Sequence, residues 1–565
     1  HADSVENLNT VTVAGAGGGA AGVGATLNVT FAENTTAAYI DNNAEVSAGK
    51  DVLVEASSER FVNSAAIAGA GGGAAGVAGA VSVIAVGSLL DGEAKSGLGN
   101  GDAASYADGQ TTKSAVGDQL GNSAQASETR SVLDAKANKM AVGSHMDDST
   151  ANIPLNNTQA FIGAGAKVKA GEDVGVTASD KTIAIVAAGA GAGGGAAGVA
   201  GSFGVVLLHD SAEAFIADGA QVNAKQHTDV KATTSENVFN VGITGSGAGA
   251  ADVSASFVVN VVSSDTAAYI GDADVNKDAS YQTANQSVGV VADSSSNLVT
   301  VAAQGGGAGA ASVGGVFDTN VLTKRTKAYI GEGADVAARH TIEVAAASHE
   351  NIVSGGVSIR GAGAAAVSAV AAANVVANTT EARIGAAQDD STKSAATVDS
   401  DGNVKLSATD DTLIIAVSAV GNGAGAAGVG ANIGANVIAN KTRAYVSDNS
   451  DVKARGNAAG TDVYNGTLGA ATAMPGIAGG KSGAIDIDGD GSAEGNVGSG
   501  ASFNVKGSGS GDPNAGADPS SGSVGGTVTE AGAVTTGIAS AEISFTLDKV
   551  TDAVTQALML QSFDT

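Results

Sequence analysis

The sequence predicts an all-β solenoid, a stack of similar coils built from β-strands, and three observations lead to this fold class. A Gly/Ala-rich run returns along the chain, as "AGAGGGAAGVGA" at 14–25 and "AGAGAGGGAAGVAGS" at 188–202. A motif of the type "TAAYIDNNAEVSAGKDVLVEAS", at 36–57, returns with it. In both, apolar side chains alternate with the period of two that strands require, and helical spacing is absent.

One aromatic position in the second motif defines the repeat length. Its occupants are Tyr39, Phe161, Phe215, Tyr269, Tyr329, Arg383 and Tyr445. Successive members are 122, 54, 54, 60, 54 and 62 residues apart. We therefore expect seven repeats of about 54 residues, and the first interval carries an insertion of roughly residues 91–157. We interpret the row as a stacked ladder of like side chains, with a ligand-binding aromatic row as the alternative.

Small side chains dominate the composition and suggest how the repeats pack. Glycine accounts for 83 of the 565 residues, aromatic residues for 3%, and tryptophan is absent. In "GVGATLNVTF", Val23, Leu27 and Phe31 lie on one face of a strand, whereas Thr26 and Asn28 lie on the other. A single repeat cannot bury its own apolar face, so we expect stacking on the next repeat to bury it.

We expect the Gly/Ala runs to be packing faces rather than phosphate-binding loops. Glycine and alanine side chains barely rise above the backbone, so a second sheet can approach closer than the usual ~10 Å. Because a period of 54 residues is long for one coil, we also expect two or more coils in each repeat.

The chain divides into three expected regions. The repeat solenoid covers 1–456, including its insertion, and a Gly/Ser/Asp-rich loop region follows at 457–540. Residues 541–565 become apolar again, which predicts a C-terminal cap or docking segment.

Charge and cysteine content exclude several classes of function. The formal net charge is −29 and cysteine is absent. An acidic surface repels phosphates, which argues against nucleic-acid binding, and the lack of cysteine excludes disulfide scaffolds, zinc fingers and thiol catalysis. The uncharged stretch 183–208 is apolar enough to suggest a transmembrane helix, but its many glycines disfavour one. We expect no membrane insertion, with a glycine-rich membrane-inserted protein as an alternative.

The best chemical motif is "DIDGDGSAE" at 486–494. Alternating carboxylates followed by a glycine turn are typical of calcium-binding loops. We expect Asp486, Asp488 and Asp490 to bind Ca²⁺, with Glu494 compensating for Val497 at the position where such loops carry an acidic ligand. A solvated acidic turn is the alternative. We expect no catalytic residues, because no pair of the six histidines has metalloprotease spacing and no nucleophile motif has a plausible histidine partner.

The run "GAGGGAAGVGA" with the "AYIG.GA.V.A" motif resembles the repeats of large bacterial surface adhesins, of the filamentous-haemagglutinin-like and long autotransporter passenger types. The resemblance spans about 5–456. It implies a right-handed parallel β-helix, secretion to the cell surface, and a role in adhesion or in a biofilm matrix. It implies no catalysis.

These observations predict an extracellular structural or adhesive fibre protein, either a surface adhesin stalk or a matrix filament subunit. The alternative is a carbohydrate-active β-helix enzyme that acts on an extracellular polysaccharide. Unpaired strand edges at the end of a solenoid recruit further strands. We therefore expect head-to-tail self-association into filaments, or binding to a receptor on a host or neighbouring cell.

Overall fold

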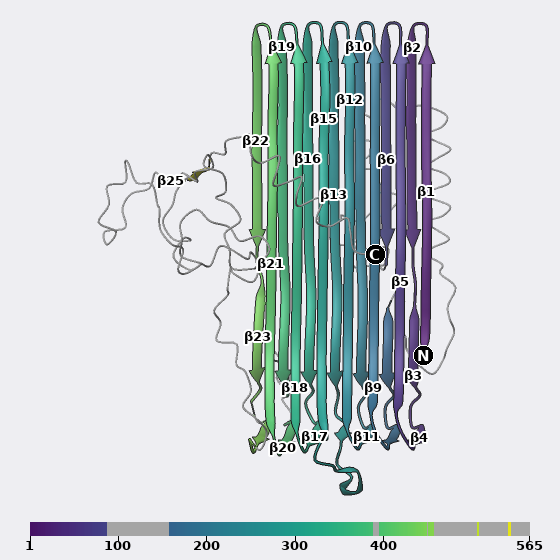
Figure 1. Ribbon diagram of the computed structural model, residues 1–565, viewed down its shortest axis with the longest axis vertical. Coiled ribbons are helices and arrows are strands. Elements are labelled where there is room, and N and C mark those ends of the chain that lie inside the picture. The colour runs from purple at the N-terminus through teal and green to yellow at the C-terminus, as the bar shows by residue number, and fades with distance from the viewer. Residues whose placement is uncertain (88–156, 388–394, 449, 457–504, 508–540, 544–565) are drawn as a thin grey trace, which may run out of the picture. The chain divides into compact units, whose positions relative to one another are not determined.

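The computed structural model describes residues 1–87, 157–387, 395–448, 450–456, 505–507 and 541–543. The chain divides into two units, His1–Thr461 and Asp462–Thr565. In the second unit, β25 (Val505–Gly507) pairs antiparallel with β26 (Ala541–Ile543). The first unit is a parallel β-solenoid, which confirms the predicted all-β fold (Figure 1).

Three parallel sheets form the walls of the solenoid, and we name them sheets A, B and C. Sheet A contains β1 (Ala2–Gly18), β5 (Val52–Gly72), β9 (Val174–Gly194), β12 (His227–Ala248), β15 (Ser287–Ala308), β18 (Thr341–Ala362) and β21 (Asn403–Ala424). Its strands run side by side in this order, each from a different repeat.

Sheet B faces sheet A along most of its length, and sheet C closes the coil at one end (Figure 1). Sheet B contains β2 (Ala21–Ala32), β6 (Ala75–Val86), β10 (Ala197–Ile216), β13 (Ala251–Ile270), β16 (Ala311–Ile330), β19 (Ala365–Ile384) and β22 (Ala427–Ile438), with the short strands β3 (Thr36–Ile40), β7 (Thr158–Ile162) and β23 (Lys441–Val446). Sheet C contains β4 (Glu45–Ala48), β8 (Lys167–Ala170), β11 (Gln221–Ala224), β14 (Asp274–Val275), β17 (Asp335–Ala338), β20 (Thr397–Ser400) and β24 (Asp451–Ala454). A 3₁₀ turn, η2 (Ala279–Tyr281), lies in the loop after β14.

Each repeat forms one coil, so the expectation of two or more coils per repeat is wrong. The register is direct: Ala2 lies opposite Ala56, and Ala56 lies opposite Ala178. The strands of sheet A reach 22 residues and the longest strands of sheet B reach 20, so a single turn of the chain uses the whole period. The insertion expected at 91–157 falls between β6 and β7, and all of it except Asn157 lies outside the described residues.

The Gly/Ala runs form the tight edge where the chain passes from sheet A to sheet B. In the first coil β1 ends at Gly18 and β2 begins at Ala21, and Figure 1 shows these turns aligned along one edge. A Cβ atom added to Gly198 would lie 2.7 Å from the carbonyl oxygen of Gly247 in the facing sheet. A Cβ atom on Gly191 would meet no atom within 4 Å. The inward-facing glycines therefore form a close sheet-to-sheet contact, as predicted, and the outward-facing ones do not.

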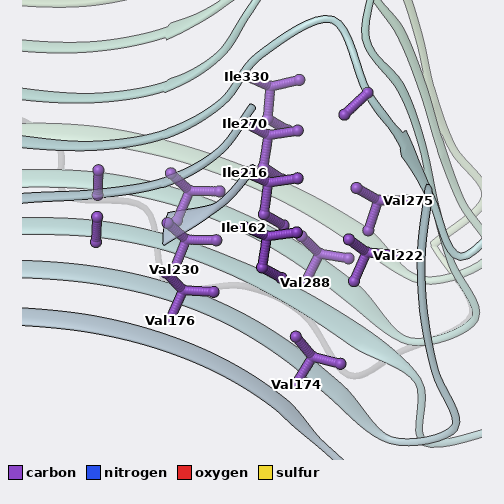
Figure 2. Packing of buried hydrophobic residues seen from close by; sticks show 14 of the residues in the cluster. Ile162, Val174, Val176, Ile216, Val222, Val230, Ile270, Val275, Val288 and Ile330 are labelled. Carbon is purple, nitrogen blue, oxygen red and sulfur yellow. The ribbon is translucent and has the colours of Figure 1, made fainter. Parts of the chain in front are cut away.

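The main apolar core occupies the opposite end, at the corner that sheet C encloses. Figure 2 shows Ile162, Ile216, Ile270 and Ile330 one above another, each from a successive coil and each fully buried. Val222 and Val275 of sheet C pack into the same cluster. Because like residues stack on like, every coil contributes the same apolar layer.

Between the corner and the glycine edge, the interior of the solenoid alternates polar and apolar layers, whereas the outer face of sheet B next to that edge is apolar. The alternation predicted for residues 22–31 is confirmed, since inward and outward residues take turns along β2. Buried Thr26 and Asn28 face the interior, whereas Val23 is 60% exposed. The expectation that stacking buries the apolar face is therefore wrong for this part of sheet B, because Val23 and the other outward residues of β2 lie on the outer surface.

Candidate functional site

An aromatic ladder runs along the outer surface of sheet B. Ring centroids of Tyr39, Phe161, Phe215, Tyr269 and Tyr329 are 4.7 to 5.0 Å apart in consecutive pairs, and the rings are nearly parallel. The guanidinium of Arg383 continues the row, 3.9 Å from the centre of the Tyr329 ring. The predicted stacked ladder is thus confirmed. The rings between its ends cover one another's faces, which leaves only their edges for any ligand.

A layer of buried charges crosses the interior between sheets A and B. The Arg60 guanidinium donates hydrogen bonds to Asp180 and, at 2.6 Å, to Asp210. Thr182 donates to the same oxygen of Asp210, and Thr158 donates to Asp180. The side chains of Asp180 and Asp210 are 0% exposed and that of Arg60 is 1% exposed. One cation therefore serves two buried carboxylates.

Burial, and then the neighbouring charges, change the pKa values of the cluster. Burial raises the pKa of Asp180 to about 6, against the lowering effect of Arg60, and raises that of Asp210 well above its usual range. Burial alone would lower the pKa of Arg60, but Asp210 and Asp180 raise it above its ordinary value. We expect the guanidinium to stay charged and the two carboxyl groups to retain a proton more readily than exposed ones.

The raised pKa of Asp180 predicts how stability depends on pH. Between about pH 4, where an unfolded aspartate titrates, and about pH 6, Asp180 holds its proton more often in the folded chain than in the unfolded chain. The contribution of Asp180 to the free energy of unfolding therefore decreases as the pH rises through this window. Urea unfolding across it should show a flatter profile for Asp180→Asn than for the parent. An equal slope in the two proteins would contradict the assignment.

The same arrangement recurs further along the solenoid. The Lys324 ammonium lies 3.3 Å from a carboxylate oxygen of Glu236 and 3.7 Å from one of Glu350, and these three side chains are 0% exposed. Arg360 pairs with Asp252 nearer the glycine edge. A column of asparagines connects the coils between these levels, with side-chain hydrogen bonds of 2.7 to 2.8 Å. It comprises Asn260, Asn320, Asn374 and Asn436 of sheet B, and Asn240 of sheet A donates to Asn260 within one coil.

These buried carboxylates cannot act on an external substrate. The Arg60 and Lys324 clusters lie between the corner core and a second apolar cluster that contains Val62, Leu298 and Ile352. Both apolar layers exclude water and larger molecules. The chemistry available here is the pairing of charges inside the wall, which fixes how successive coils stack. Sequence reasoning did not identify these residues.

Two of the surface hollows lie at opposite parts of the repeat array, one in the later coils and one on the first coil. One, of about 580 Å³, lies beside the η2 loop and is lined by Arg339, His340 and Asp401. Its guanidinium is already bound to Asp401 at 2.6 Å. The other, of about 450 Å³, lies on the first coil and is lined by Tyr39, Val46 and other largely apolar residues.

The first and last coils present matching edges. Within the described residues, β1 to β4 pair only with the second coil, and β21 to β24 pair only with the sixth. Corresponding positions carry similar residues, such as Tyr39 and Tyr445 on the surface and Val46 and Val452 in the corner core. Coil 1 therefore repeats the pattern that would extend coil 7.

The expected calcium ligands Asp486, Asp488, Asp490 and Glu494 lie outside the described residues. In the part that the structure describes, no three histidine, aspartate or glutamate side chains come together as a metal-binding group. Calcium binding at 486–494 therefore stays a prediction.

Comparison with known proteins gave no match to this chain, whether with family models, curated proteins or solved structures. Among the described residues, no helix has the length and apolar character needed to cross a membrane.

Proposed function

We propose that the protein is an extracellular structural or adhesive fibre protein without catalytic activity, a surface adhesin stalk or matrix filament subunit. The observation that carries this proposal is the continuity of the solenoid, in which the same residue types stack at the same positions through seven coils. A regular stack of this kind provides an extended surface rather than a deep cavity for a substrate. The resemblance to filamentous-haemagglutinin-like and autotransporter repeats supports the same function and a cell-surface location.

The burial of the acidic clusters weakens the competing proposal of a carbohydrate-active enzyme. Glycoside hydrolysis needs two carboxyl groups that flank the sugar. Asp180 and Asp210 are instead enclosed by the wall, with Arg60 between them. Calcium binding by the 486–494 loop remains part of the fibre proposal, because extracellular modules commonly use weak calcium sites.

The partner in this proposal is a second copy that adds its first coil to the last coil of its neighbour, while a cell-surface receptor is the alternative partner. Such head-to-tail contact joins two different surfaces and therefore produces open filaments. The corner positions support it, because valine would stack on valine and alanine on alanine across the junction, as they do between coils. The apolar hollow on the first coil would be covered at the same time.

The test is to place a charge in the core of this junction. Leu8 faces the interior of the first coil and its counterpart in the last coil is Ile414. We expect Leu8→Asp to shorten or abolish filaments seen by electron microscopy, because a charge buried at the junction is not compensated. Val5→Asp is the matched control, because Val5 lies on the same strand and is 66% exposed. A full-length chain that stays monomeric at high concentration, or filaments of unchanged length in Leu8→Asp, would contradict the proposal.

A further inference from the structure

The outer surface of sheet B carries a continuous apolar face next to the glycine edge. It consists of the six outward positions from Ala21 to Phe31 in the first coil and of their partners in the other six coils, and we call it the valine face. One of its columns is valine throughout: Val23, Val77, Val199, Val253, Val313, Val367 and Val429. All of its other positions are alanine, glycine, valine, leucine, isoleucine or phenylalanine, apart from Thr319.

The strands beneath this face differ from those of a sheet whose outer side is exposed to water. Antiparallel sheets with one wet side turn their polar residues outward, and all-parallel sheets normally have both faces covered. Here the outward residues are apolar, such as Val253 and Phe317. The inward residues are mixed, since polar Asn260 and Asn320 alternate with buried residues such as Val262. Val253 is 46% exposed and Phe317 is 40% exposed. The alternation continues through all seven coils. Exposure is highest at positions such as Val23 and Ile433, at 60% and 66%, whereas Ala85, Val205 and Leu207 pack together on the same face and are only 2–7% exposed.

The size of the face matches a protein interface. Seven strands about 4.8 Å apart, with ten residue steps of about 3.3 Å along each, give a face of about 1,100 Å². Stable interfaces bury about 800 Å² on each partner, and monomeric soluble proteins rarely expose apolar patches above about 600 Å². The valine face therefore has the area that a stable dimer interface needs, although residues such as Val205 and Leu207 already pack against their neighbours on it.

The surface shape of the valine face and the residues at its border indicate which kind of partner it binds. Alanine, valine and glycine make a low surface, and its ridges repeat at the spacing of the strands. The valine face of a second copy has ridges at the same spacing, so the two faces can pack together. Phe203, Phe257 and Phe317 form one stacked ridge across it, with centroids 4.6 and 4.8 Å apart. Farther from the glycine edge the same sheet becomes charged, as at the Arg325–Asp265 pair. An apolar centre with a polar rim is typical of protein interfaces.

A lipid bilayer fits the face less well than a protein does. β2 and β22 are the edges of sheet B in the described residues, so their outer backbone groups lack a strand partner. Hydrocarbon would leave such groups without hydrogen bonds, at a cost of several kcal/mol each. In a face-to-face dimer the edges stay at the rim, in contact with water.

We infer that the valine face is the interface of a symmetric dimer, in which it packs on the valine face of a second copy. The contact is isologous, since both copies use the same surface. It is also distinct from the end-to-end contact of the proposed fibre and does not depend on the fibre function. Head-to-tail stacking lengthens the solenoid, whereas pairing through sheet B joins two solenoids side by side. With the net charge of −29, raising the salt concentration should strengthen the dimer by screening repulsion between copies.

Sedimentation velocity on the full chain tests this inference. We expect the double variant Val253→Glu/Val313→Glu to associate about a hundredfold more weakly than the parent, because four like charges would be buried in the interface core. Ile243→Glu/Val357→Glu is the matched control, since these residues are 55% and 36% exposed on the outer surface of sheet A. The control should dimerise as the parent does. Circular dichroism and thermal melting establish that the parent and the two double variants are folded alike. To separate the side-by-side contact from the head-to-tail contact, the same three measurements are repeated with Leu8→Asp added to each protein.

Because the chain contains no cysteine, crosslinking provides a conservative second test. Ala255 lies near the centre of the valine face, so its copies come close together around any two-fold axis through that centre. Ala255→Cys should form a disulfide-linked dimer on mild oxidation, whereas Ala303→Cys, outward on sheet A, should not. Equal crosslinking of both variants, a parent chain that stays monomeric in high salt, or flotation of the parent with phosphatidylcholine vesicles that Val253→Glu/Val313→Glu prevents would overturn the inference.

Discussion

Replacing Arg60 with methionine is expected to lower the free energy of unfolding by about 3–5 kcal/mol, the usual cost of removing one partner from a buried ion pair. Methionine fills much of the volume of the side chain but supplies no charge and no hydrogen-bond donor. Asp180 and Asp210 would then face each other in a dry interior with only hydroxyl donors. Urea unfolding at neutral pH measures the loss, because both carboxyl groups are then driven towards ionisation.

The neighbouring residues provide a matched control for this prediction. Glu59 and Lys181 lie one position away from Arg60 and Asp180, point outward, and form an ion pair of 2.8 Å at 48% and 45% exposure. Exposed pairs contribute at most about 1 kcal/mol, so Lys181→Met should lower stability by no more than that. Adding Asp180→Asn and Asp210→Asn to Arg60→Met should restore part of the loss. Equal losses for Arg60→Met and Lys181→Met would show that burial of the charge does not control its energetic role.

The sequence could predict the repeats and their alignment, since like residues recur at fixed intervals. Ala2, Ala56 and Ala178 occupy one column because every repeat carries alanine at that place. It could not predict the number of coils in a repeat. The period gives the number of residues between equivalent positions, but it does not say how many turns of the chain those residues form. Because the strands of sheets A and B are about 20 residues long, one turn accounts for the whole period.

The buried charges had a signal in the sequence that was not used. Arg60 has the same strand parity as Val54 and Val62, which face the interior. A charge at an inward position demands a partner, so parity alone predicts buried pairing. The identity of the partner cannot be predicted from the local sequence. Asp210 lies 150 residues away from Arg60, and the two meet only because the coils on either side of the insertion stack on each other.

Alternate glycines of the Gly/Ala runs face inward and outward, and only the inward ones pack against the facing sheet. We expect substitution of an inward glycine to cause a large loss of stability. Gly198→Leu should lower the free energy of unfolding by about 3 kcal/mol, the upper end of the cost of overpacking. The obstacle is the backbone of the facing sheet, because even a Cβ atom would lie 2.7 Å from the carbonyl oxygen of Gly247. A backbone in a paired strand cannot step aside as a flexible side chain can. Gly22→Leu should behave alike, since its Cβ would collide with the carbonyl oxygen of Gly71.

Gly191→Leu is the control, because it makes the same change of residue type at a glycine that does not pack against the facing sheet. It replaces a glycine in the same run and coil with the same residue, but a Cβ atom there meets nothing within 4 Å. Its melting temperature should stay close to that of the parent, or rise slightly, because leucine restricts the unfolded chain more than glycine does. Hydrogen exchange should show increased opening of β9, β10 and β12 in Gly198→Leu alone, because in a stacked array each coil depends on its neighbours. If Gly198→Leu and Gly191→Leu both melt like the parent, the Gly/Ala runs accept large side chains at either position. The close contact between the sheets would then not stabilise the solenoid.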